Sequence, residues 1–160
     1  MLQFFAKGTW LASIWEPLAE YMTFEDFKRL HSETIMYCQC IEHDLKWIYS
    51  YMLKGNQYET FETLEKTTLG ALVKKLKELD NSDNNPFISN DDYNFLKQMT
   101  EKRNYWCHQC CIDFIYENNF INSPEYNKVC NKLIRDHDRF EIVSNNVEKV
   151  RLKAAETFRR

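Results

Sequence analysis

An arginine, an asparagine and a histidine lie close together in the segment 101–108, whose sequence is EKRNYWCH. Arginine presents a fixed fork of N–H groups to phosphate oxygens, and histidine exchanges a proton near neutral pH. Asn104 and His108 would share one face of a helix. Arg103 would lie about 140° around the same helix from His108, with a side chain long enough to bend toward it. These residue types suit phosphoryl chemistry on RNA without a metal.

The helices that must position these residues follow from the spacing of apolar side chains. Steps of three and four residues predict four helices, over about 23–55, 61–80, 91–118 and 124–160. Thr23 is suited to cap the first helix, and Pro124 is suited to begin the last, which Ser144-Asn145-Asn146 could interrupt. Arg103 falls on the apolar line of the third helix, so burial would require an anionic partner.

The predicted fold is an all-α, antiparallel bundle of four to five helices with a loop over 81–90. We expect two parts: an aromatic N-terminal segment, 1–22, and a helical bundle, 23–160, with an extended C-terminal helix. The N-terminal segment could be an accessory helix or a leader. A plain helical interaction protein, with this tryptophan-containing segment as its working surface, is a further interpretation.

The segment RNYWCH, 103–108, resembles the R-x4–6-H motif of HEPN domains, including the polar residue directly after the arginine. The segment TTLGALVKKLKEL, 67–79, resembles the second helix of these proteins. The order of long helix, shorter helix, loop, motif helix and terminal helix is also that of HEPN bundles. The resemblance covers roughly residues 23–143 and implies a HEPN-like fold.

The resemblance also implies a homodimer in which two motifs face one cleft, acting as a metal-independent endoribonuclease of a toxin–antitoxin or phage-defence system. A ribose 2′-OH would attack the adjacent phosphate, with one His108 as base and the partner's as acid. Arg103 would stabilise the charge on the phosphorane, and Asn104 would orient either Arg103 or the phosphate. Glu42 and Lys102 are possible accessory residues. No cofactor and no metal are implied.

An apolar set beside the motif points independently to a dimer. Cys111, Ile112 and Ile115 would form a second apolar face on the third helix, in addition to the face that packs in the bundle. A monomer would leave this face exposed, which folded proteins rarely tolerate.

Composition limits the other classes of function. The 160 residues carry a net charge of −3, which excludes the class of proteins that bind nucleic acid through an overall positive charge. No window approaches the roughly 18 apolar residues of a membrane span. The six cysteines fall in predicted helices, so we expect a cytoplasmic protein with reduced thiols that pack as small apolar residues.

Several alternatives remain open at this stage. A HEPN-like module without catalysis could bind nucleotide, RNA or a partner protein. Cys107 and Cys110 could supply two zinc ligands, although a structural site needs four. His137 lies between Asp136 and Asp138 and is best interpreted as a satisfied core histidine.

A final expectation concerns regulation by a possible antitoxin or nucleotidyltransferase-like partner. In HEPN toxins that such partners silence, the motif extends to R-x4-H-x-Y, and the tyrosine is adenylylated. Here Cys110 stands at that position, and neither Tyr105 nor Tyr116 has the expected spacing from His108. We therefore expect no adenylylation at the motif.

Overall fold

The computed structural model describes residues 22–82 and 85–158. The described helices are α2 (Phe24–Met52), α3 (Gln57–Thr63), α4 (Leu69–Asp80), α5 (Asn90–His108), the short 3-10 helix η1 (Phe120–Asn122) and α6 (Pro124–Phe158). The described residues contain no strand, so the all-α prediction is confirmed. The predicted N-terminal segment lies outside the described residues except for Met22. None of the described helices is long and apolar enough to cross a membrane.

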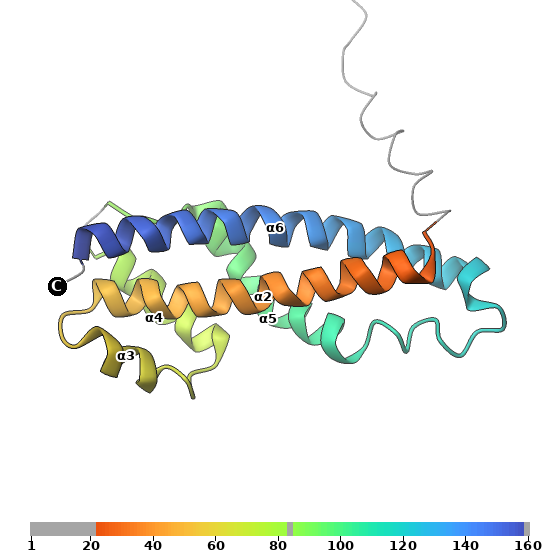
Figure 1. Ribbon diagram of the computed structural model, residues 1–160, viewed down its shortest axis with the longest axis horizontal. Coiled ribbons are helices and arrows are strands. Elements are labelled where there is room, and N and C mark those ends of the chain that lie inside the picture. The colour runs from red at the N-terminus through yellow and green to blue at the C-terminus, as the bar shows by residue number, and fades with distance from the viewer. Residues whose placement is uncertain (1–21, 83–84, 159–160) are drawn as a thin grey trace, which may run out of the picture.

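The two long helices, α2 and α6, lie side by side and run in the same direction (Figure 1). At one end the Tyr126 hydroxyl donates to the Met22 carbonyl at 3.3 Å. At the other end the Gln57 amide donates to the Phe158 carbonyl at 3.2 Å. The prediction of an antiparallel bundle is therefore wrong for α2 and α6. Helices α5 and α6 are antiparallel, because Phe95 packs on Phe140 and the Trp106 indole donates to Asp136.

The parallel arrangement arises from a break in the predicted helix 61–80. The chain instead forms α3, then a turn, and then α4, which begins at the N-cap Thr68. Helix α3 folds back along α2, with the Phe61 ring stacked 4.3 Å from that of Trp47. This extra reversal sets α4 and α6 in the direction of α2 and leaves α5 running against them.

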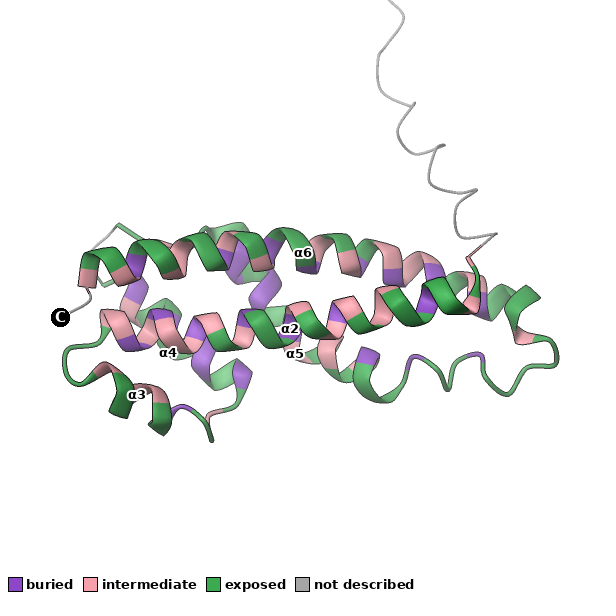
Figure 2. Cartoon of the chain, in the orientation of Figure 1, coloured by how far each residue is buried: buried purple, intermediate pink, exposed green. Residues whose placement is uncertain are grey.

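The core lies along the seam between α2 and α6, where buried positions repeat at helical spacing (Figure 2). Its fully buried members on these two helices include Ile41, Leu45, Ile48, Leu133, Phe140 and Val143. Helix α6 continues without interruption through 144–146 because Val143 and Val147 keep the buried stripe on both sides. Its hydrophobic face outweighs the weak helix propensity of Ser and Asn.

Helix α5 ends at His108, ten residues before the predicted end at about 118. The N–H groups of Gln109 and Cys110 both donate to the Tyr105 carbonyl, at 2.9 and 3.0 Å, which closes the helix. Beyond it, Phe114 turns inward between Phe27 and Tyr126, with ring centroids 5.4 and 5.1 Å away. The burial of this ring fixes the segment 109–119 as a series of turns.

A buried carboxylate anchors the predicted loop after α4. Asp80 accepts the N–H groups of Phe87 and Ile88, at 2.8 and 3.1 Å, and the Tyr93 hydroxyl at 2.9 Å. The described part of the loop is thus fixed to the bundle, and α5 starts from a defined position.

Candidate functional site

Arg103 reaches from the last two turns of α5 to α2. Its Nη1 atom donates to Glu42 Oε2 at 3.1 Å, and Lys46 Nζ lies 3.4 Å from the other oxygen of Glu42. The Arg103 side chain is 38% exposed and that of Glu42 is 24% exposed. The structure therefore brings together two of the predicted site residues and gives Arg103 the anionic partner that its place on the apolar line requires.

Asn104 and His108 lie on the solvent side of α5. Both are exposed, and neither makes a hydrogen bond or ion pair with the part of the chain that the structure describes. Because Arg103 faces α2 and His108 projects about 140° around the helix, a single chain does not bring the two together. His108 is also the last residue of α5, where its ring is free to approach a ligand.

Lys102 is held by a buried aspartate of α6. Its Nζ atom pairs with Asp136 Oδ1, and the Trp106 indole donates to Oδ2 of the same carboxylate at 2.9 Å. Asp136 is 6% exposed and Trp106 is 1% exposed. The predicted accessory residue Lys102 thus joins α5 to α6 and does not face Arg103.

His31 positions the end of α5, a role that the sequence pattern did not indicate. Its Nε2–H donates to the Trp106 carbonyl at 2.7 Å, and the Cys110 thiol donates to the same oxygen at 3.2 Å. The available signal was the position of His31 one turn after Phe27, on the buried line of α2. A histidine there must satisfy its ring nitrogen inside the bundle, and Trp106 provides the acceptor.

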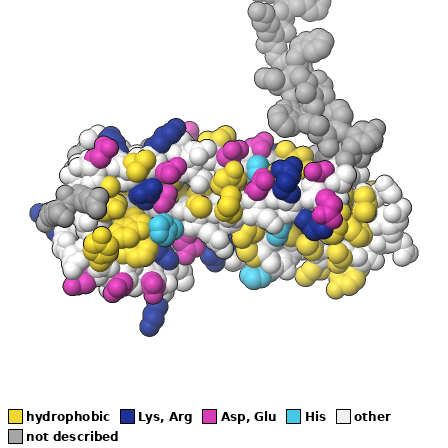
Figure 3. All heavy atoms as spheres, viewed as in Figure 1, with side chains coloured by type: hydrophobic (Ala, Val, Ile, Leu, Met, Phe, Trp, Pro, Cys, Tyr) yellow, Lys and Arg dark blue, Asp and Glu magenta, His cyan; other side chains and the backbone are white. Residues whose placement is uncertain are grey.

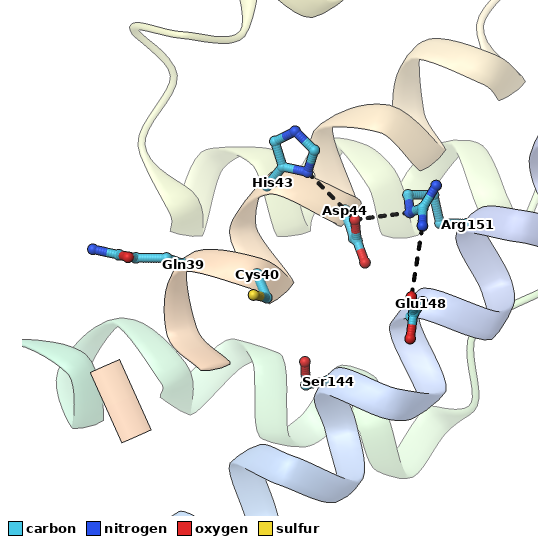
Figure 4. A pocket seen from close by; sticks show the side chains of 7 residues that line it. All are labelled: Gln39, Cys40, His43, Asp44, Ser144, Glu148 and Arg151. Carbon is cyan, nitrogen blue, oxygen red and sulfur yellow. Dashed lines mark hydrogen bonds and ion pairs between the residues drawn. The ribbon is translucent and has the colours of Figure 1, made fainter. Parts of the chain in front are cut away.

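A second group of polar side chains lines a pocket of about 390 Å³ between α2 and α6 (Figure 4). Arg151 Nε lies 2.8 Å from Asp44 Oδ1, and His43 Nδ1 lies 3.4 Å from the same oxygen. The Trp47 indole donates to His43 Nε2 at 3.3 Å, so both ring nitrogens are engaged. In Figure 4 the Cys40 thiol extends away from this ring, so Cys40, His43 and Asp44 form no nucleophile–base pair.

The cysteines near the motif divide into buried and exposed thiols. Burial raises the pKa of Cys38 and of Cys110 to about 12, with their neighbours Cys107 and Cys111 adding to the effect. Cys107 and Cys111, like Cys40 of α2, are exposed, contrary to the interpretation that these cysteines pack as small apolar residues between helices. Among the described residues, no three His, Cys, Asp or Glu side chains are grouped so that they could hold a metal ion.

His137 is largely buried and hydrogen-bonded. Its ring nitrogens lie 3.0 Å from Glu33 Oε2 and 3.3 Å from Asp138 Oδ1. The Tyr37 ring packs edge-on against it, with the centroids 5.6 Å apart. This matches the interpretation of His137 as a satisfied histidine.

The predicted second apolar face of the motif helix is not helical. Cys111, Ile112 and Ile115 lie in the turns after α5, where Ile112 is 62% and Ile115 is 41% exposed. The expectation of a helix face is wrong because α5 ends at His108, but the apolar side chains are exposed as expected. Tyr116, the next residue, is 85% exposed.

The face of the molecule drawn in Figure 3 carries acidic and basic side chains interspersed, without a broad area of one sign. A comparison with known proteins finds no matching family model, no matching curated protein and no matching solved structure. The function must therefore be argued from the arrangement of Arg103, Glu42, Asn104 and His108.

Proposed function

We propose that this protein is a HEPN-like, metal-independent endoribonuclease that acts as a homodimer. The observation that carries the proposal is the state of the motif: Arg103 is oriented by Glu42 at 3.1 Å while Asn104 and His108 remain exposed on the same helix. A phosphate would meet a preoriented guanidinium and an imidazole free to exchange protons. The role as toxin of a toxin–antitoxin or phage-defence system belongs to the same proposal.

Each residue has a defined part in the proposed reaction. The 2′-oxygen attacks the adjacent phosphorus, its proton passes to one His108, and the 5′-oxygen leaves with a proton from the partner's His108. The products are a 2′,3′-cyclic phosphate and a 5′-hydroxyl end. Arg103 stabilises the negative charge that develops on the phosphorane, and Asn104 donates a hydrogen bond to it.

The homodimer is needed because one chain separates the two main groups. Arg103 faces α2, whereas His108 faces away from it, so a second copy must supply the missing group to each site. The exposed Ile112 and Ile115 lie within seven residues of His108 and offer the apolar surface that such an interface requires.

A module that binds RNA or nucleotide without cleaving it is the second candidate. The observation that favours it is the same ion pair, because an arginine bound to Glu42 could serve only to join α5 to α2. In that case His108 would have no chemical role, and its replacement would leave RNA binding unchanged.

Incubation of the purified protein with a single-stranded RNA in EDTA tests the proposal. We expect cleavage that leaves cyclic phosphate ends, and we expect His108→Ala and Arg103→Ala each to lower the rate by at least 100-fold, in line with the loss of a general acid–base group or a charge-stabilising group. Far-UV circular dichroism verifies that both variants remain helical.

A matched control for Arg103 is another arginine that is exposed to the same extent and also pairs with a carboxylate. Arg139 is a partly exposed arginine of α6 whose guanidinium meets Asp92 at 3.6 Å, and Arg139→Ala should retain activity. Full activity in folded His108→Ala protein would rule out the proposed acid–base role. Binding of RNA with no cleavage in the wild type would favour the second candidate.

A further inference from the structure

A pocket of about 460 Å³ lies beside the motif, between the end of α5, the turns that follow it and the first half of α6. Tyr105 and Asp113 line one side of it, and Lys128, Lys132 and Arg135 line the other. The proposed reaction uses none of these side chains. Their chemistry therefore calls for a separate explanation.

The three cations are spaced so that they share one face of α6. Lys128, Lys132 and Arg135 follow each other at steps of four and three residues, and the two outer ones are about 10 Å apart along the helix axis. Within the described chain, none of the three forms an ion pair with a carboxylate within 4 Å. Three positive charges on one pocket wall without ion-pair partners favour an anionic ligand.

Neither of the carboxylates described in this pocket forms an ion pair with the three cations. Asp113 accepts the Tyr105 hydroxyl at 2.7 Å, and Glu125 is exposed. Lys132 Nζ instead lies over the Tyr105 ring, 3.1 Å from its centroid. Burial lowers the pKa of Lys132, and Lys102 adds to this effect, while Asp136 and Asp113 oppose it only in part. An anion in the pocket would relieve this unfavourable environment of the Lys132 ammonium.

The pocket adjoins the proposed catalytic histidine. Tyr105 and His108 are three residues apart on the last turn of α5, so their side chains leave the same side of the helix. A chain of phosphates that passes His108 would therefore reach Tyr105 and the cations behind it. On the side of α5 that faces Glu42, the cations that the structure describes are already paired, because Lys46 and Arg103 lie 3.4 and 3.1 Å from that carboxylate.

We propose that this pocket binds backbone phosphates of single-stranded RNA next to the phosphate at which the 2′-oxygen would attack with His108 as the base; this inference rests on the proposed function. Lys132 moves from the Tyr105 ring to a phosphate, and the exposed ring face then stacks on a base. A basic groove with an aromatic side chain is the combination that binds single-stranded nucleic acid with little sequence preference. Lys128 and Arg135 continue the contacts along the strand.

Binding is measured by fluorescence anisotropy with a labelled 2′-O-methyl RNA oligonucleotide, which lacks the attacking hydroxyl and stays intact. The test variant is Lys128→Gln/Lys132→Gln/Arg135→Gln. The control is Lys66→Gln/Lys74→Gln/Lys75→Gln, which also removes three positive charges but from exposed positions outside the pocket.

The expected effect follows from counterion release. Each lost phosphate contact lowers the slope of log K against log salt by about 0.7 for a single strand, so the pocket variant should lose about 0.7 to 2 units of slope. The same relation corresponds to a loss of affinity of about 5- to 100-fold at 0.1 M salt. The control variant should lose less than half as much slope as the pocket variant.

Lys132→Gln could disturb the packing on Tyr105, so Lys128→Gln/Arg135→Gln is made as well. Both of its positions are exposed, and the double variant should still lose slope and affinity. Equal losses in the pocket and control variants would overturn the inference, because net charge would then explain them. Binding of inorganic phosphate without any oligonucleotide binding would also overturn it, since the pocket would then be a small-anion site.

Two outcomes separate this inference from the proposed function. If the wild type cleaves RNA and the pocket variant keeps the same affinity and KM, the pocket has no role and the nuclease proposal stands. If the pocket variant loses RNA affinity but the wild type never cleaves RNA, the pocket assignment stands and the catalytic proposal fails.

Discussion

Replacement of Asp136 by alanine should destabilise the fold strongly, because this buried carboxylate joins α5 to α6 through two partners. Asp136→Ala removes the acceptor of the Trp106 indole N–H at 2.9 Å, a bond to a charged group worth about 1.5–3 kcal/mol when its donor is buried. It also removes the partner of Lys102, whose side chain is 27% exposed, so that pair adds only about 1 kcal/mol. We expect the free energy of unfolding to fall by about 3 kcal/mol.

The assay is urea unfolding followed by far-UV circular dichroism, with Asp138→Ala as the matched control. Asp138 lies two residues further along α6, its side chain is 52% exposed, and its carboxylate is 3.3 Å from His137 Nδ1. Its replacement should cost less than about 1 kcal/mol, as for other exposed pairs. The two variants make the same chemical change in the same helix and differ in what the carboxylate touches.

A double-mutant cycle then isolates the indole bond. Trp106→Phe keeps most of the buried ring and removes the N–H, so Asp136→Ala should cost at least about 1 kcal/mol less in the Trp106→Phe background. If Asp136→Ala destabilises no more than Asp138→Ala, or if the two changes are additive, the carboxylate does not hold the motif helix and the reasoning fails.

Three further predictions follow from the thiols. A thiol reagent should modify three cysteines in the native protein and all six in denaturant, because Cys38, Cys110 and Cys130 are buried and the others are exposed; fast native modification of more than three would contradict the burial. Burial raises the pKa of these three thiols from 9.0 to about 11 or 12, so the thiols lose their protons at a lower pH in the unfolded chain than in the folded one. The free energy of unfolding should therefore fall as the pH rises from about 9 toward 11–12. Urea midpoints that stay constant between pH 8 and 10.5 would contradict this expectation. Intact-mass spectrometry after co-expression with the genomic neighbour should show no AMP adduct on residues 103–116, because Cys110 is 2% exposed and its thiol already donates to a carbonyl; an adduct mapped there would show that another acceptor, such as the exposed Tyr116, is used.

The sequence predicted the elements whose signals are local. Thr23 caps α2, with its hydroxyl oxygen accepting the Asp26 N–H at 3.1 Å, and α6 begins at Pro124. The apolar stripe of α6 predicted a helix on both sides of Asn145 but left open a break at 144–146, and the structure shows no break there. Capping and periodicity are properties of neighbouring residues, so a single sequence shows them.

The errors concern features that distant residues decide. The helical spacing of apolar side chains continues past His108, and nothing nearby shows that Phe114 is drawn inward by Phe27 and Tyr126. Similarly, the turn between α3 and α4 depends on the packing of Phe61 against Trp47. The direction of α6 relative to α2 follows from that turn, so it could not be predicted without it.

The candidate site, too, was predictable from the sequence only where neighbouring residues determine it. That Arg103 needs an anion could be argued from its place on an apolar line, and Glu42 had been singled out as an acidic residue of the first helix. Which side of α5 each motif residue faces depends on how the helix packs, and the packing directs Arg103 toward Glu42 and leaves His108 on the side of Tyr105. The sequence showed which groups are present, while their separation is a property of the fold.

That separation explains why the proposed activity requires two copies and a local basic surface. The net charge of −3 opposes RNA binding by the molecule as a whole, so affinity must come from a region where cations are not paired. The face of α6 with Lys132 is such a region, and Lys132 contacts Tyr105, one turn before His108 on α5. Arg103, held by Glu42 on the opposite side, can meet the same phosphate only across an interface between two chains. The residues that bind the strand and the residue that stabilises the phosphorane would then come from different subunits, so dimerisation would switch on cleavage without being required for binding.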